Sequence, residues 1–147
     1  MIRLIILLIM YFVTQLLNAQ NSSAPVNTDS YASISVEVPD IAGDKGEVLF
    51  ALYDSEEHFN MRESKDRKKS EISDGKAKVV FEDVTPGIYA ILCFHDVNGN
   101  GRLDFNEMGI PLEPYGSSNN VFRMGPPLFE DAKFTIENKS LDLTIKF

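Results

Sequence analysis

The segment Asp96–Glu107 (DVNGNGRLDFNE) contains the residues whose types and spacing indicate the most definite chemistry. It matches the calcium-loop pattern D-x-[DN]-x-[DN]-G-x5-E at every fixed position. Calcium takes about six to eight hard oxygen ligands, which alternate side chains of a curling chain can supply, and Gly101 permits the sharp bend. The pattern predicts a calcium ion bound by Asp96, Asn98, Asn100, Arg102 through its backbone carbonyl, Asp104 and Glu107.

The flanks of this loop differ from those of an EF-hand. The apolar stretch Ile88–His95 precedes it where a helix would be needed, and Gly109 and Pro111 prevent a long second helix. A calcium loop without a helix pair to open is expected to be structural rather than a sensor. The alternative is a turn rich in Asn and Gly that binds no metal, since these residues also form turns unaided. Magnesium is less favoured because it keeps more of its water.

A second polar segment, Tyr115–Asn120 (YGSSNN), allows two interpretations. An exposed Tyr with Asn and Ser beside it could stack on a sugar and bond its hydroxyl groups. The segment could instead fold over the calcium site and support it from outside. Four prolines between 111 and 127 predict an extended excursion here rather than a strand. The residues considered as ligand contacts or supports are Glu113, Tyr115, Ser118, Asn119 and Asn120.

Catalysis has weaker support in the sequence. His95 lies beside Asp96, and Ser117 and Ser118 follow downstream, so a hydrolase using His95 and Asp96 is conceivable. However, there is no G-x-S-x-G elbow, no HExxH motif and no His/Cys cluster for zinc, and Asp96 already belongs to the calcium pattern. We therefore expect no catalytic residues. Cys93 is expected to be a small buried hydrophobe.

The elements that must position the loop read as short strands. Tyr31–Val38 alternates, with Ile34, Val36 and Val38 on one face, whereas Ile88–His95 is apolar on both faces, as in a central strand. About seven strands separated by turns predict an all-β fold, a single β-sandwich with a long calcium-loop insertion. The other expected strands are Gly46–Asp54, Lys76–Glu82, Lys133–Glu137 and Leu141–Phe147.

Finer expectations follow from local patterns. Residues 138–140 are expected to form a hairpin-like link between the last two strands, with Ile145 and Phe147 facing inward. Ser55 can cap the one short helix. The charged run Arg62–Lys69 is read as a solvated loop rather than an anion-binding patch, because mixed-sign runs usually face water.

The beginning of the chain has the features of a targeting segment. Arg3 precedes the apolar run Leu4–Val13, and Ala19 stands at a typical cleavage position, so residues 1–19 are predicted to be a secretory signal peptide. A retained N-terminal anchor is the alternative. Residues 20–30 are polar and are expected to be flexible, leaving a domain at 31–147. We expect an exported protein, periplasmic or extracellular, with no stable membrane span after cleavage.

Composition excludes several classes of protein. The 147 residues carry a formal charge of −8, which argues against a nucleic-acid partner because phosphate binding needs clustered Lys and Arg. A single Cys cannot form an internal disulfide. A hydrophobic content of 44% is too high for a disordered chain.

From about Ile34 to Phe147 the chain resembles a family of secreted bacterial proteins known only as a domain of unknown function. Ser117 departs from the family pattern, which has an apolar residue there. The resemblance implies a small exported β-domain and brings no established activity. The segment Thr85–Tyr89 also resembles transthyretin-like and immunoglobulin-like sandwiches, an analogy of fold only. The family resemblance rests on Pro86–Ala90, Phe94–Asp96, Asn98–Asp104, Gly109–Pro111, Glu113–Gly116, Ser118–Asn120 and Gly125–Ala132.

Together these patterns favour an exported, non-enzymatic β-sandwich with one structural calcium, acting as a binding or surface-accessory module for an unknown protein or glycan. The alternative is a carbohydrate- or peptide-binding domain that uses the Tyr115–Asn120 loop.

Overall fold

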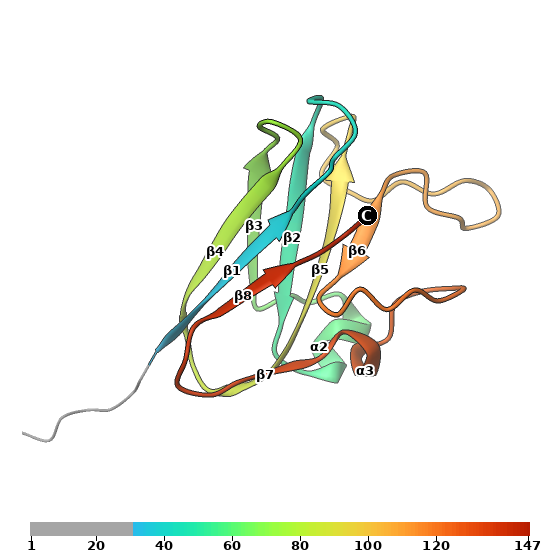
Figure 1. Cartoon of the computed structure of the whole chain (residues 1–147). Helices are drawn as coiled ribbons and strands as arrows, with labels where there is room; N and C mark the ends of the chain where they lie inside the picture. The colour runs from blue at the N-terminus through green and yellow to red at the C-terminus, as the bar shows by residue number, and fades with distance from the viewer. Residues whose placement is uncertain (1–30) are drawn as a thin grey trace, which may run out of the picture.

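Two β-sheets face each other in the computed structural model, which describes residues 31–147 (Figure 1). The predictions for residues 1–19 and 20–30 lie outside the described residues. Within them the chain forms eight strands and two short helices, so the predicted all-β sandwich is confirmed. The elements are β1 (Ala32–Val38), β2 (Glu47–Tyr53), α2 (Glu56–Met61), β3 (Asp66–Glu71), β4 (Ala77–Val84), β5 (Gly87–Asp96), β6 (Tyr115–Ser117), α3 (Phe129–Ala132), β7 (Phe134–Ile136) and β8 (Leu141–Thr144).

The smaller sheet has the order β4-β1-β8. β1 is antiparallel to β4 and parallel to β8. Alternation along β1 buries Ile34, Val36 and Val38, as the sequence pattern predicts, and these side chains fill the space between the sheets with Phe50 and Phe81.

The larger sheet has the order β3-β2-β5-β6, and β7 pairs with the beginning of β5. The prediction of a central strand at β5 is confirmed. Its inner face meets the core, and its outer face is covered by the two helices, so both faces are apolar. Phe59 of α2 makes edge contacts with Tyr53 and Phe129, at ring-centroid distances of 5.1 and 5.7 Å. Ser55 caps α2 as predicted, accepting the amide of His58.

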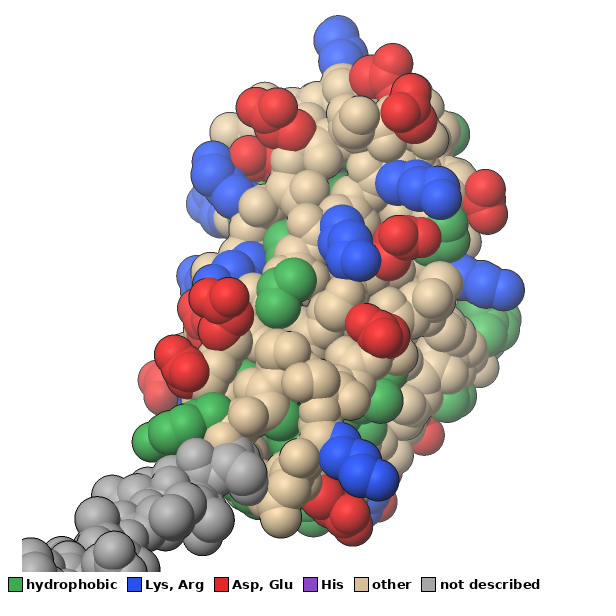
Figure 2. Space-filling view, turned by 60° about the vertical axis from the view of Figure 1, so that its left-hand side comes forward, with side chains coloured by type: hydrophobic (Ala, Val, Ile, Leu, Met, Phe, Trp, Pro, Cys, Tyr) green, Lys and Arg blue, Asp and Glu red, His purple; other side chains and the backbone are tan. Residues whose placement is uncertain are grey.

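The charged run at Arg62–Lys69 is not simply a loop, because part of it forms the edge strand β3. Its side chains alternate between half-buried and exposed, and Lys69 pairs with Glu47 at 3.0 Å. Charged side chains on an edge strand discourage pairing with other chains. Figure 2 brings the side of β3 and β4 forward and shows blue and red side chains interspersed there, without an anionic or cationic patch.

The predicted hairpin at residues 138–140 is wrong. β7 pairs with β5, whereas β8 pairs with β1, so this link carries the chain from one sheet to the other. Ser140 anchors it through its hydroxyl, which bonds to Ser33. Ile145 is buried as predicted, but Phe147 is 40% exposed because the strand ends at Thr144.

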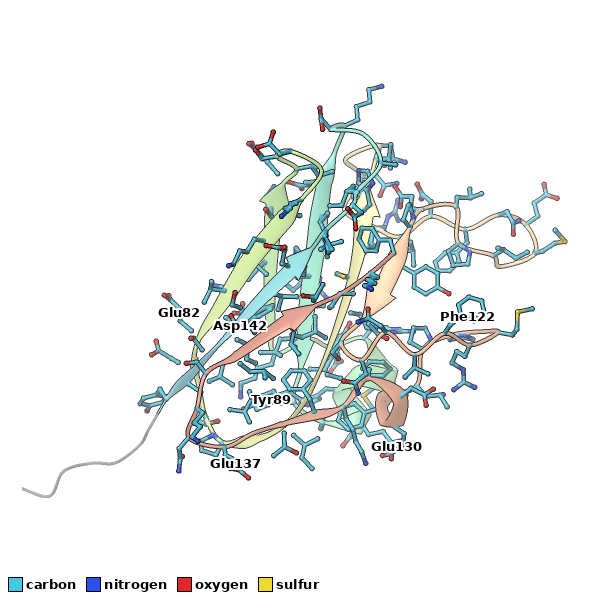
Figure 3. The ribbon with its side chains drawn as sticks, viewed as in Figure 1. Glu82, Tyr89, Phe122, Glu130, Glu137 and Asp142 are labelled. Carbon is cyan, nitrogen blue, oxygen red and sulfur yellow. The ribbon has the colours of Figure 1, made fainter. Side chains whose placement is uncertain are left out.

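Two loops project from the same side of the sandwich, one before β6 and one after it (Figure 1). The prediction of an extended excursion rather than a strand is wrong in part, because this segment contains the short strand β6. Phe122 lies at the outer end of the second loop and is 90% exposed (Figure 3). Among residues 31–147, neither helix is long and apolar enough to cross a bilayer.

Candidate metal centre

Asp96 is the last residue of β5 and organises the loop that follows. Its side chain is fully buried, and its carboxylate accepts hydrogen bonds from the amides of Gly99, Asn100 and Gly101, at 2.8, 3.1 and 2.7 Å. The two glycines have φ values of +74° and +76°, which allow the chain to curl round this carboxylate. The central strand thus ends in a tight loop whose amide groups point inward.

Three predicted ligands come together beyond this curl. The side-chain amide of Asn98 donates to Asp104 Oδ2 at 2.6 Å, and that of Asn100 donates to both Asp104 oxygens, at 3.0 and 2.9 Å. The carbonyl oxygens of the two Asn side chains accept the backbone amides of Asn100 and Arg102. The Arg102 side chain is exposed, so its charge need not face the site.

In this arrangement the Asn98 and Asn100 side chains direct their NH2 groups at Asp104, whereas a cation needs their oxygens. The oxygen and nitrogen of an Asn amide have nearly the same shape, so a half-turn of the amide exchanges them. Turning Asn98 and Asn100 in this way would bring two oxygens beside the Asp104 carboxylate, as calcium requires, but would break the bonds that these oxygens accept from the amides of Asn100 and Arg102. The fit is partial, because no group of three or more His, Cys, Asp or Glu side chains placed to hold a metal occurs among residues 31–147.

Glu107 makes none of the bonds of this convergence. It occupies the tip of a small hairpin in which Phe105 bridges Pro111. The amide of Asn106 bonds to the carbonyl of Ile110, and the Asn106 side chain accepts two further amides of the hairpin. Glu107 is exposed at this tip.

Glu113 instead lies against the loop. Its carboxylate accepts the amide of Val97 at 2.9 Å and the amide of Asp104 at 3.1 Å, and its residue is only 7% exposed. It therefore connects the first residue after Asp96 with the predicted ligand Asp104.

The side chains of Ser118, Asn119 and Asn120 bind distant parts of the chain. Ser118 accepts the amide of Ile91 and donates to the carbonyl of Ala132. Asn119 donates to the carbonyls of Asp131 and Lys133, at 3.0 and 2.9 Å. Asn120 bonds to the Thr144 carbonyl and the Lys146 amide, at 2.8 and 2.7 Å, as a neighbouring strand would. These bonds tie β6 to the central strand, to α3 and to the C-terminal segment.

The remaining candidates have other surroundings. Tyr115 is half-buried in β6. The buried ring of His95 donates from Nε2 to the Lys45 carbonyl at 2.6 Å, while Asp96 bonds to the loop amides. Cys93 is buried as predicted, and burial raises the pKa of its thiol.

Sequence reasoning missed two glycines that position this end of the molecule. A Cβ atom on Gly46 would collide with the backbone carbonyl of Asp96, where the loop begins. A Cβ on Gly116 would collide with Ile145 and the backbone of Lys146. Glycine in a strand or at its start is a known signal of such close approach, but it does not identify the partner.

The fold and this loop define a class of protein, a β-sandwich whose central strand ends in an Asn-rich polar loop. The chain belongs to a family of uncharacterized proteins conserved in bacteria, DUF2141, whose sequence model matches residues 36–144, from within β1 to the end of β8. The predicted membership of a bacterial family of unknown function is thereby confirmed. No curated protein and no solved structure matches the chain.

Proposed function

We propose that this protein is an exported, non-enzymatic module that binds one structural calcium ion in the loop after β5. The observation that carries the proposal is the convergence of the Asn98 and Asn100 amides on the Asp104 carboxylate. Asp96, Asn98, Asn100, Asp104 and the Arg102 carbonyl would bind the ion, whereas Glu107, the remaining residue of the sequence pattern, is exposed at the hairpin tip.

Calcium would act here by tying the loop together. The loop side chains bond chiefly to one another and to nearby amides, so an ion at their centre would replace local hydrogen bonds by oxygen ligands. Export supports this proposal, because extracellular modules use such loops at millimolar calcium. The predicted signal peptide at residues 1–19 supports export.

A binding role is supported by the two projecting loops. Exposed apolar side chains gather on proteins where partners bind. A protein or glycan partner is therefore part of the proposal. The carbohydrate alternative at Tyr115–Asn120 has less support, because Ser118, Asn119 and Asn120 use their polar groups within the chain. The exposed large apolar residues on the two loops are Val97, Phe105, Met108, Ile110, Leu112, Val121, Phe122, Met124 and Leu128.

Thermal unfolding with and without calcium tests the proposal. With a Kd of about 0.1–1 mM, calcium at about 2 mM should stabilise the fold by about 0.6–1.8 kcal/mol. For a domain of this size the Tm should rise by a few degrees over that in EDTA. Asp104→Ala should abolish the shift, since Asp104 is where the Asn side chains converge.

Asp142→Ala is the matched control. Asp142 is an exposed carboxylate on β8 (Figure 3), so its loss should leave the calcium shift unchanged. Equal melting curves in calcium and EDTA for the unaltered chain would contradict the proposal. An equal shift with magnesium would contradict the preference for calcium.

A further inference from the structure

Two glutamates follow the loop closely enough in sequence to close it, and the structure places them very differently. The calcium pattern assigns the closing position to Glu107. That residue is exposed at the tip of the hairpin around Asn106, whereas Glu113 is buried against the loop itself.

Glu107 is carried by a hairpin that has several bonds of its own. The bond from the Asn106 amide to the Ile110 carbonyl and the two bonds accepted by the Asn106 side chain fix the turn that carries it. The Leu112 amide also bonds to the Asp104 carbonyl and holds the base of the hairpin. These bonds fix the hairpin whose exposed tip carries Glu107.

Glu113 already spans the loop. One carboxylate oxygen accepts the amide of Val97, next to Asp96, and the other accepts the amide of Asp104. Hydrogen bonds to a charged acceptor are stronger than neutral ones, and this carboxylate is 7% exposed, so water competes little for it. The following residue, Pro114, accepts the His95 amide and so holds Glu113 beside the central strand.

We propose that Glu113, rather than Glu107, is the residue that closes the calcium loop. It acts as a positioning residue: it holds the backbone of Val97 and Asp104 so that the Asp104 carboxylate faces Asn98 and Asn100. Loss of this carboxylate frees the Asp104 end of the loop, and the ion then has to order it on binding. This inference rests on the proposed calcium function.

Calcium titration calorimetry on a matched pair of variants tests the inference. Glu107→Gln and Glu113→Gln make the same chemical change at the two positions. We expect Glu107→Gln to bind calcium within about twofold of the unaltered chain, and Glu113→Gln to bind at least about tenfold more weakly. Glu113→Asp, a milder change, should lie between them and covers the case in which Glu113→Gln fails to fold.

A third variant separates positioning from general stability. Asn119→Ala removes two bonds outside the loop, to the Asp131 and Lys133 carbonyls, so it should lower the Tm and leave calcium affinity within about twofold. A tenfold loss in Glu107→Gln, unchanged affinity in both Glu113 variants, or an equal loss in Asn119→Ala would each overturn the inference. Absence of calcium binding to the unaltered chain would instead refute the proposed function.

Discussion

Two Asn-rich segments lie on either side of β6 and use the same chemistry in opposite ways. In the loop of residues 96–104, side chains bond to amides and side chains a few positions away. In the segment Ser118–Asn120, side chains bond to elements as distant as β5, α3 and the C-terminal segment. The side chains of the first segment stabilise their own loop, and those of the second connect separate elements of the fold.

This difference explains why one segment is a candidate site and the other is not. A side chain that bonds to a distant backbone group holds two parts of the fold together, so its release separates them, and at Ser118 it also leaves buried groups unpaired. Side chains that bond to near neighbours can exchange those partners for an ion without disturbing the sandwich. Asn98 and Asn100 belong to the second kind, and Asn119 and Asn120 to the first.

The largest expected effect comes from the segment that organises the fold. Ser118→Ala removes the buried bonds to the Ile91 amide and the Ala132 carbonyl, leaving both without this partner. We expect it to lower the free energy of unfolding by about 2–4 kcal/mol, measured by urea denaturation.

Ser64→Ala is the control for this change. Ser64 bonds near the surface to Arg67, so its loss should cost less than about 0.5 kcal/mol. Equal losses of unfolding free energy in the two variants would contradict the claim that the segment Ser118–Asn120 holds the fold together.

The smallest expected effect concerns a pair outside both segments. Asp54 and His58 are 2.7 Å apart at the start of α2. The hydrogen bond to Asp54 raises the pKa of His58, and the hydrogen bond from His58 lowers the pKa of Asp54. The His58 contribution is present below its ordinary pKa of about 6.5 and is lost as the pH rises through the raised value; the Asp54 contribution is lost on acidification below about 4.

His58→Gln should therefore lower the Tm slightly near pH 5.5, and this difference should disappear by about pH 8. The calcium shift of the variant should equal that of the unaltered chain at either pH. A calcium shift that changes with His58→Gln would show that the loop is not the self-contained unit described above.

Much of this fold could be predicted from sequence where burial alternates simply. β1 was predictable because its alternation reports burial, and β5 because a run that is apolar on both faces indicates a central strand. β3 was not, because charged side chains on an edge strand resemble a loop. The passage of the chain from one sheet to the other between β7 and β8 could not be predicted, because a short polar link does not show which strands its neighbours pair with.

In the candidate site, too, local features could be predicted from the sequence and features that depend on distant contacts could not. The convergence at Asp104 follows a local pattern that the sequence carries in full. The positions of Glu107 and Glu113 depend on the hairpin around Asn106 and on β6, which local spacing does not specify. Likewise, nothing in the string Ser118–Asn120 identifies Ala132 or Thr144 as its partners.

Calcium titration followed by NMR tests the central claim most directly, because it observes both Asn-rich segments in one experiment. As calcium rises to about 5 mM, several times the expected Kd, the side-chain amides of Asn98 and Asn100 and the backbone amides of Gly99 and Gly101 should shift together. The NMR signals of the Asn119 and Asn120 side-chain amides should not shift. Unmoved loop signals, or equal shifts in both segments, would contradict the account.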